Sequence, residues 1–327
     1  MINLPSTAAE RPVQRKFRFG RRSALFAVVL LLLLITQQLW TNLMFVRRIP
    51  QLGPRTVALT LTPVALESGG FGPLELAGAW RLGADDPRFG GFSSLAVDGG
   101  ALVALNDIGV VARFAKPGAA MARVAINELP SGPGAGGSKG DRDSEALLRD
   151  PQGRGWWVAF ENKHQIWLYD RAFGKALQRV DFGVGRWPHN GGIEGLAADG
   201  RDLLLVPEDS GALVRLGGGT ARAMPVAGRG QVSEAANLPG GGILLVERRP
   251  TLFGFRNALV RLERAPRGYR IGARLPLGVG AFDNVEALAV EPRPDGAVRL
   301  WLMTDDNFMR AQRTLLVALD APAGTLR

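Results

Sequence analysis

A motif that recurs five times limits what this chain can fold into more than any other feature of its sequence. In each copy a polar residue, usually a glutamate, stands directly before a short apolar run and a turn rich in glycine or proline. The stretch EGLAADGRDLLLVPE from Glu194 aligns without gaps with EAANLPGGGILLVER from Glu234. Copies 40 to 52 residues apart, with several short strands in each, are typical of β-propeller blades. The five aligned polar residues are Ser94, Glu145, Glu194, Glu234 and Glu286.

Each unit divides into four apolar segments joined by tight turns of the DG and GG kind, which predicts a four-stranded antiparallel blade. The last unit shows only three such segments. The segment 74–83 stands before Ser94 in the same way as the fourth segment of unit four stands before Glu286. We therefore expect 74–83 to complete the last blade and so to form the seam that closes the ring, with 55–66 adding to this seam. The sequence therefore predicts an all-β fold, a β-propeller of five four-stranded blades. A sixth, degenerate blade built partly from 55–90 is the open alternative.

The composition excludes several kinds of site. The chain has no cysteine, which rules out disulfides, cysteine-ligated zinc and iron–sulfur clusters, and we expect no nucleotide or haem cofactor either. A net charge of +10 suggests nucleic-acid binding, but residues 1–55 hold nine Lys and Arg against one Glu. The remaining 272 residues carry 31 basic and 29 acidic side chains and are nearly neutral. We therefore expect no nucleic-acid partner.

The N-terminal segment has the pattern of a membrane anchor. Residues 1–22 are basic, and 23–46 contain a wholly apolar run from Ala24 to Ile35 that continues less strongly to Val46. No small-residue cleavage motif follows, which favours an uncleaved signal anchor. By the positive-inside rule the basic side stays in the cytoplasm, so the domain 47–327 is expected in the periplasm, attached to the inner membrane. Secretion after signal cleavage is the alternative.

The geometry of a blade predicts that the acidic residues converge. The first strand of a blade lines the central channel and the second runs back antiparallel to it, so the start of one and the end of the other lie at the same face. The second strands end in polar residues too. We therefore expect a ring of carboxylates at one mouth of the channel. The second-strand ends are Asn106-Asp107, Glu161-Asn162, Glu208-Asp209, Glu247-Arg248-Arg249 and Asp305-Asp306-Asn307.

Like charges gathered in this way need an offset, and two are plausible. A hard divalent cation such as Ca²⁺ accepts carboxylate oxygens without a fixed geometry; its predicted ligands are Glu145, Glu161, Glu208, Asp209, Asp305 and Asp306. Alternatively basic side chains neutralise the ring and bind an anionic substrate; these are Arg142, Lys163, Arg248 and Arg249. The predicted catalytic residues are Glu194, Glu286 and His189. The structural alternative is that each Glu only caps backbone amides or pairs with an Arg of the neighbouring blade.

The stretches FSSLAVDGGALVALND, SEALLRDPQGRGWWVAFENKHQIWLYD, NGGIEGLAADG and DNVEALAVEPRPDGAVRLWLMTDDNF…RTLLVALD resemble the phytase-like family with esterase-like activity of phytase. The resemblance spans roughly residues 70–325 and implies a bacterial, usually exported propeller that hydrolyses phosphate or other esters. Propeller phytases bind calcium through acidic loops. This chain resembles those loops only at the repeated Glu and Asp/Asn positions.

Two functions follow as hypotheses. The first is a hydrolase that acts on a small anionic ester or phosphoester with a cation held at the acidic mouth. The second is a non-catalytic propeller that binds a ligand or a protein of the cell envelope, because the fold hosts both roles. The sequence leaves the substrate, the metal and the oligomeric state open.

Overall fold

The computed structural model describes most of the chain beyond residue 47. The described residues are 25–26, 28–32, 36, 48–66, 70–118, 122–182, 192–208, 211–226, 230–251, 254–266, 268–277, 284–309 and 312–326. The chain divides into two compact units, Met1–Phe45 and Val46–Arg327. In the first unit the described residues are helical. Among the described residues, no helix has the length and apolarity that crossing a bilayer requires. Most of the predicted anchor, 23–46, lies outside the described residues.

The second unit is built from strands, as the sequence predicts. One short helix, α2 (Lys139–Arg142), precedes the second repeat unit. The strands are β1 (Arg55–Pro63), β2 (Glu75–Ala84), β3 (Phe92–Asp98), β4 (Ala101–Asn106), β5 (Val110–Ala115), β6 (Arg123–Glu128), β7 (Ser144–Arg149), β8 (Gly155–Phe160), β9 (Gln165–Asp170), β10 (Ala176–Asp181), β11 (Ile193–Asp199), β12 (Asp202–Pro207), β13 (Ala212–Gly217), β14 (Thr220–Pro225), β15 (Gln231–Asn237), β16 (Ile243–Thr251), β17 (Gly254–Ala265), β18 (Gly268–Leu277), β19 (Val285–Pro292), β20 (Val298–Thr304) and β21 (Leu315–Ala321).

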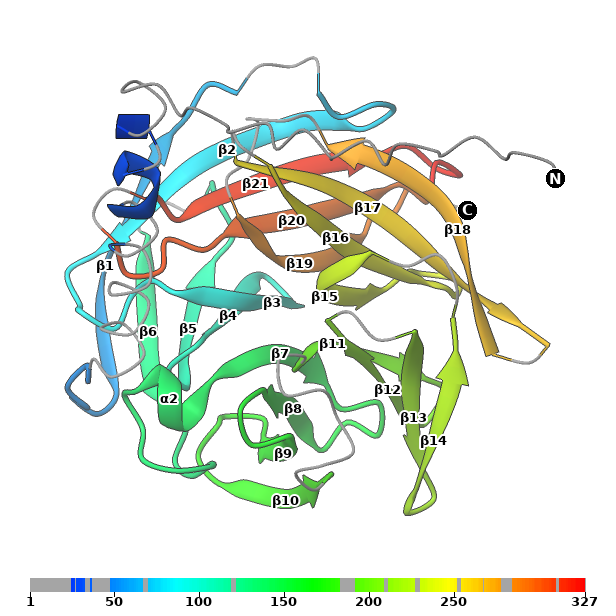
Figure 1. Ribbon diagram of the computed structural model, residues 1–327, viewed down its shortest axis with the longest axis horizontal. Coiled ribbons are helices and arrows are strands. Elements are labelled where there is room, and N and C mark those ends of the chain that lie inside the picture. Colours follow the sequence, from blue (N-terminus) through cyan, green and yellow to red (C-terminus); the bar gives the residue numbers. More distant parts are fainter. Residues whose placement is uncertain are drawn as a thin grey trace, which may run out of the picture. The chain divides into compact units, whose positions relative to one another are not determined.

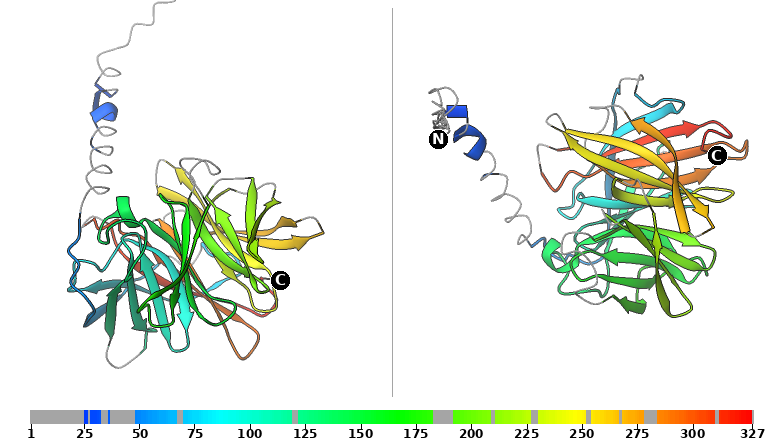
Figure 2. Two further views of the ribbon diagram at one scale, coloured as in Figure 1. Left: turned by 90° about the horizontal axis from the view of Figure 1, so that it is seen from below. Right: turned by 45° about the vertical axis from the view of Figure 1, so that its right-hand side comes forward.

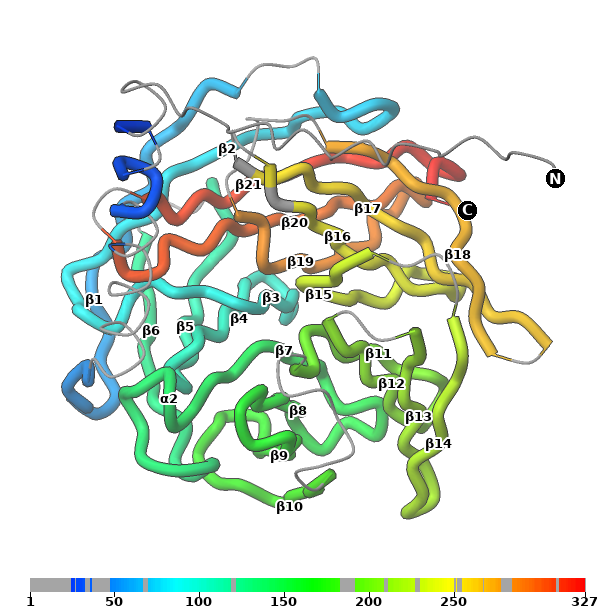
Figure 3. The backbone as a smooth tube through the Cα atoms, viewed as in Figure 1, coloured from blue at the N-terminus to red at the C-terminus, as the bar shows by residue number. Residues whose placement is uncertain are grey.

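The strands form antiparallel groups of four that follow the five repeat units. Three groups are separate sheets, β7–β10, β11–β14 and β15–β18, each in sequence order. The first strands of the units, β3, β7, β11, β15 and β19, contact one another in succession, and β19 returns to β3. Figure 1 and the tube in Figure 3 show these five strands at the centre, with their partners running outward. The arrangement is consistent with a β-propeller of five blades.

The first and last groups are joined by the two strands that precede the first repeat. Strand β2 pairs with β21, as in Trp80↔Leu316, and so supplies the fourth strand that the last repeat lacks. Strand β1 pairs with β2 on one side and with β6 on the other. The result is one nine-stranded sheet, β19-β20-β21-β2-β1-β6-β5-β4-β3. The predicted seam is confirmed, and 55–90 joins the ends of the ring instead of forming a sixth blade.

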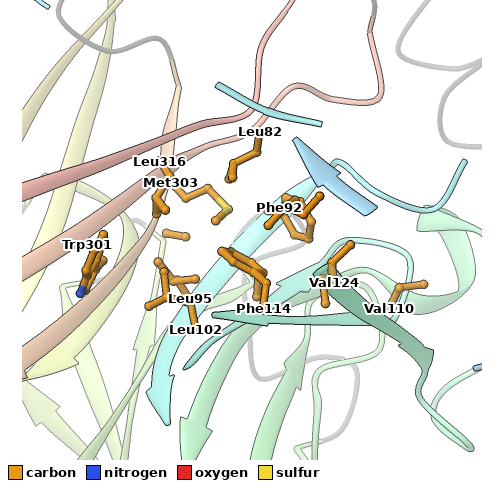
Figure 4. Packing of buried hydrophobic residues seen from close by; sticks show 14 of the residues in the cluster. Leu82, Phe92, Leu95, Leu102, Val110, Phe114, Val124, Trp301, Met303 and Leu316 are labelled. Carbon is orange, nitrogen blue, oxygen red and sulfur yellow. The ribbon is translucent and has the colours of Figure 1, made fainter. Parts of the chain in front are cut away.

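Apolar side chains fill the spaces between neighbouring groups. Five clusters of buried residues each join one group to the next around the ring. In the cluster that joins the last group to the first, Trp301, Met303 and Leu316 pack with Phe92 and residues of β4 to β6 (Figure 4). Burial of apolar area on both faces of every sheet is the main favourable term that holds such a ring. The left view of Figure 2, turned by 90° from that of Figure 1, shows the sheets from the side.

A β-bulge at the start of every first strand corrects one part of the sequence alignment. In β11 the pairing jumps from Ile193↔Pro207 to Gly195↔Val206, which leaves Glu194 as the bulged residue. In β15 the jump is from Val232↔Glu247 to Glu234↔Val246, so the bulged residue is Ser233. The aligned position of Glu234 was therefore wrong by one residue, and Ser93 rather than Ser94 is the equivalent residue in β3.

The physical reason lies in the turn between the two strands. The equivalent pairs are Ala198↔Leu203 in β11 and β12 and Asn237↔Ile243 in β15 and β16. They enclose four and five residues, so the glycine-rich connection of the fourth unit is longer by one residue. The gapless alignment of the third and fourth units therefore matched their second strands correctly but displaced their first strands by one residue. A shift of one residue moves a side chain to the other face of the strand.

Candidate functional site

The bulged residues place three glutamates at the entrance of the ring. They are Glu145 in β7, Glu194 in β11 and Glu286 in β19. A bulge turns its extra side chain out of the regular alternation of the strand, which is why bulges often aim residues into sites. The two remaining bulges carry serines that bond to the next group: Ser93 Oγ donates to the carbonyl of Ser144 at 2.5 Å and Ser233 Oγ to that of Val285 at 2.9 Å.

Each second strand has one residue paired with the residue just before the bulge, and the residue after it belongs to a second set at the same entrance. Four of the five are acids, namely Asp107, Glu161, Glu208 and Asp305, and the fifth is Arg248. In the four acids the backbone N–H donates to the carbonyl of a residue just before the neighbouring first strand, at 2.8 to 3.1 Å. The shared hydrogen bond shows that these positions are equivalent. The predicted convergence of strand starts and strand ends at one face is therefore observed.

A lysine that the sequence analysis did not select lies inside the acidic group. Lys139 begins α2, in the loop before β7. Its Nζ lies 3.1 Å from Asp107 Oδ2, 3.4 Å from Asp143 Oδ1 and 3.7 Å from Glu145 Oε1. Asp143 was not predicted as a site residue either. The alternation of Lys139, Asp141 and Asp143 directly before the second acidic strand was the available signal in the sequence.

Arg248 provides the second cation, from the other side of the ring. Its Nη1 donates to Glu286 Oε1 and, at 2.8 Å, to Asn284 Oδ1, while Nη2 lies 3.8 Å from Glu208 Oε1. The guanidinium also stacks over Phe255 at 5.9 Å from the ring centre. Among the described residues two cations thus face eight carboxyl groups: Asp107, Asp143, Glu145, Glu161, Glu194, Glu208, Glu286 and Asp305.

The donor set fits a hard divalent cation at one point of this group. One carboxylate oxygen from each of Asp143, Glu145 and Glu161 lies within 4.8 Å of the others. The residue Asp143 is only 2% exposed, and its Oδ1 accepts no hydrogen bond in the described part of the chain; Asp107 Oδ1 likewise has none. Buried carboxylate oxygens without partners are costly, and coordination of a hard cation such as Ca²⁺ or Mg²⁺ is one way of satisfying them. The donor set is compatible with such an ion.

Burial and mutual repulsion shift the protonation of the group. Burial raises the pKa of Glu286 to about 7, against the opposing effect of Arg248. Burial, with the charges of Glu145 and Asp306 added, raises the pKa of Asp107 to about 6. Burial and neighbouring carboxylates also raise the pKa of each of the remaining shifted acids above its ordinary value. These are Asp143, Glu161, Glu194 and Asp305.

These shifts predict that the cation-free protein becomes less stable as the pH rises. An acid whose pKa is raised by folding keeps its proton in the folded chain after the unfolded chain has released it, so stability falls between about pH 4.5 and about pH 7. Acids with a lowered pKa, such as Asp86, lose their contribution to folding stability only below about pH 4, so that contribution stays constant between about pH 4.5 and about pH 7. We expect the urea midpoint in chelator to drop from pH 5 to pH 8 and the drop to shrink in Glu286→Gln. A midpoint that is flat or rising over this range would contradict the assignment.

Two predicted site residues direct their side chains to partners outside the group. Asp306 accepts hydrogen bonds from the Gly91 N–H at 2.9 Å, the Phe308 N–H at 3.0 Å and Thr314 Oγ1 at 2.8 Å. Both of its oxygens therefore serve the seam between the last and first groups. Arg142 is buried and donates from Nη1 to the carbonyl of Leu129 at 2.6 Å. The structure thus places Arg142 between the first and second groups, although it belongs to the same short helix as Lys139.

The remaining predicted residues are placed as follows. Lys163 is exposed and forms no hydrogen bond or ion pair with other described residues, and Arg249 is an exposed residue of β16 paired with Arg256. Neither is brought into contact with the acidic group among the described contacts. His189 and Asp209 lie outside the described residues.

One further acid crosses the channel below the entrance. Glu234, in β15, is 1% exposed and accepts a hydrogen bond from Ser94 Oγ in β3, although the fourth and first groups are not neighbours. Its other oxygen accepts the Ala235 N–H at 2.9 Å, and Ser94 Oγ accepts the Leu147 N–H at 3.0 Å. Beyond this contact the same five strands surround a cavity of about 490 Å³, lined mainly by apolar residues such as Leu95, Leu147 and Leu288. The Glu234–Ser94 pair thus lies between the acidic entrance and this cavity.

Comparison with protein families gives one match that covers most of the ring. Residues 87–308, more than half of the chain, match the family described as Phytase-like: Esterase-like activity of phytase. The matched range runs from just before β3 to just after β20 and includes all eight carboxyl groups of the entrance. No curated protein matches the chain.

Solved structures show only distant likenesses. The glutaminyl cyclase of Myxococcus xanthus has 14% identity and a TM-score of 0.46, with 71% of this chain and 91% of that chain covered. A chain of the nidogen/laminin complex has 11% identity and a TM-score of 0.43, with 80% and 96% covered. For the hydrazine synthase of Kuenenia stuttgartiensis the values are 15%, 0.38, 68% and 58%, so this chain spans little more than half of that one. At these TM-scores the likenesses bear on neither activity nor ligand.

Proposed function

The chain belongs to the phytase-like family, and on that premise we propose that it hydrolyses phosphoesters or other esters at the acidic entrance of its ring. The observation that carries the proposal is the group of eight buried or half-buried carboxyls that face two cations among the described residues. Six of these acids have a raised pKa, and the buried Oδ1 atoms of Asp107 and Asp143 accept no hydrogen bond from a described residue. Strongly perturbed carboxyls gathered in an opening mark a candidate functional site.

Asp143, Glu145 and Glu161 are the residues proposed to hold a divalent cation. When bound, such an ion supplies Lewis acidity that polarises the oxygen of an ester and lowers the pKa of a water molecule. The chain's own contribution is to hold these three carboxylates together at the junction of α2, β7 and β8, against their mutual repulsion. Arg248 is proposed to orient an anionic substrate, because a guanidinium matches phosphate or carboxylate geometry. Glu208, Asp305 and the predicted Asp209 complete the acidic rim in this proposal.

Glu286 is proposed to exchange the proton of the reaction. A group with a pKa of about 7 holds and releases a proton near neutral pH, which is what a general acid or base requires. Glu194 is proposed as its partner, because its pKa is raised by burial and by Glu145, Glu161 and Glu286. Two carboxyls that repel each other tend to share one proton, so one acts as the acid while the other stays ionised. His189 stays a predicted third candidate.

The cellular setting is proposed from the sequence. The basic and apolar residues of 1–46 support attachment to the inner membrane, with the ring in the periplasm. One observation favours the alternative of a non-catalytic binding propeller: Lys139 and Arg248 already neutralise part of the ring, as a purely structural ion-pair arrangement would.

A hydrolysis assay with and without the cation separates these functions. The full-length chain is incubated with a panel of phosphomonoesters, phosphodiesters and carboxylic esters in Ca²⁺ or in chelator. We expect turnover of at least one anionic ester that is lost in chelator, restored by Ca²⁺ and strongly reduced in Glu194→Gln. An absence of turnover across the panel, in folded protein with bound Ca²⁺, would favour the binding propeller.

A further inference from the structure

The ammonium of Lys139 and the group that fits a cation share their ligands. Of the three acids near Lys139 Nζ, two, Asp143 and Glu145, also belong to the set whose oxygens lie within 4.8 Å of one another. The oxygen of Asp143 that faces Nζ, at 3.4 Å, is the buried Oδ1 that accepts no hydrogen bond in the described residues. The ammonium is therefore close enough to offset the charge but is not bonded well enough to satisfy the oxygen.

Backbone hydrogen bonds fix this loop, while among the described residues the Lys139 side chain is held only by its acidic partners and reaches solvent. The carbonyl of Gly137 accepts the Ile49 N–H at 2.7 Å, and that of Ser138 accepts the Arg142 N–H at 2.9 Å. The Lys139 side chain is 33% exposed, so its ammonium has a path to solvent. A change in the position of this charge therefore needs only rotation of side-chain torsions, which is fast and needs no motion of α2.

Arg248 does not compete in the same way. Its partners are Glu286, Asn284 and Glu208, none of which belongs to the group that fits the cation. The two basic residues of the entrance thus have different partners. Arg248 pairs with residues outside the cation-binding group, whereas Lys139 pairs with two acids, Asp143 and Glu145, that a divalent ion would need as ligands. A divalent ion bound by Asp143 and Glu145 would lie close to the Lys139 ammonium, and like charges this close repel strongly in a partly buried site.

Resting on the proposed function, we propose that Lys139 is a tethered cation that competes with the divalent ion for Asp143 and Glu145 and so sets the affinity of the site. In the absence of the ion the ammonium offsets the charge of Asp107, Asp143 and Glu145. When an ion enters, the ammonium turns outward toward the opening and away from Asp143. Lys139 is therefore a positioning and affinity-determining residue, not a ligand.

The test is the calcium affinity of Lys139→Met in the full-length chain. Methionine keeps a long apolar stem and removes the charge, so calorimetry at low salt should show Ca²⁺ binding tighter by about tenfold or more than in wild type. Lys139→Arg should stay near wild type. Lys175→Met is the matched control, because Lys175 is exposed in the turn between β9 and β10 and has no ion pair among the described residues; the Ca²⁺ affinity of this variant should not change.

Stability in chelator gives a second readout in the opposite direction. Without the ion, Lys139→Met removes the positive charge that offsets Asp107, Asp143 and Glu145, so the melting temperature of this variant in chelator should be lower than that of wild type. Added Ca²⁺ should raise the melting temperature of the variant more steeply than that of wild type. Lys139→Gln serves as the second variant if methionine prevents folding. Equal or weaker Ca²⁺ binding by the folded neutral variants would overturn the proposal. Tighter binding without hydrolysis of any ester would uphold it and refute only the hydrolase.

Discussion

Glu161→Gln is expected to lower kcat/KM for the hydrolysed ester by about a hundredfold or more. Glu161 follows β8 and contributes one of the three oxygens that fit a cation, and an amide replaces a charged ligand by a neutral one of the same shape. Because the shape is kept and the pKa of Glu161 is already raised by burial and by Glu145, the exchange should not unfold the chain. The measurement is kcat/KM against Ca²⁺ concentration.

The matched control for this variant is Glu263→Gln. Glu263 lies in β17 and forms ion pairs with Arg261 and Arg270 outside the acidic group. Its replacement removes the same charge and should leave kcat/KM within about twofold of wild type, since surface ion pairs contribute little. Unchanged turnover and unchanged Ca²⁺ dependence in Glu161→Gln would remove Glu161 from the cation-binding group. Equal losses in both variants would indicate a non-specific effect of charge.

Arg88→Met should lower the free energy of unfolding by about 3 to 5 kcal/mol, the largest stability effect that we expect. Arg88 is 1% exposed, and its guanidinium donates to Asp86 from Nε at 2.9 Å and from Nη2 at 2.8 Å. Nη1 donates to Glu128 Oε1 and to the Gly53 carbonyl, both at 2.7 Å. This network connects the chain before β1, the loop before β3 and the end of β6, so it fixes the seam from one side.

The size of this effect follows from what the substitution leaves behind. The side chain of Asp86 is fully buried, and without Arg88 its nearest cation is the half-exposed Arg55 at 3.9 Å. A buried carboxylate without a close partner is costly. Arg113→Met is the control: Arg113 pairs with Asp98, but both side chains are partly exposed, so a loss within about 1 kcal/mol is expected. Urea unfolding of both variants measures the difference, and similar losses would refute the special role of Arg88.

The sequence predicted the strands well because their signals are local. Alternating apolar residues and glycine turns fix each hairpin within a few residues, as in EGLAADG followed by DLLLVPE. The strand from 74–83 was placed in the last group because its position before Ser94 repeats that of a strand before Glu286, and β2 indeed pairs with β21. The N-terminal anchor and the roles of the site residues stay predictions.

The sequence predicted the acidic entrance only in part. Glu145, Glu194 and Glu286 were found because each stands at the same place in a repeat, but Glu234 was assigned to this set through an alignment that ignored one extra residue in a turn. Lys139 was missed because it lies in a loop outside the repeat. Arg142 was selected from that same loop, and its side chain turns instead to the carbonyl of Leu129.

By itself the sequence determined the repeat, the strand order, the closing seam and the face at which the acids gather, since all four follow from periodicity along the chain. The tertiary structure decided which acids share a site, which cation offsets them and which acid crosses the channel. These depend on contacts between residues far apart in sequence, such as Lys139 with Asp107 and Glu234 with Ser94, 140 positions away. A bulge or a one-residue turn insertion redirects a side chain to the opposite face, and the folded ring then determines what it meets.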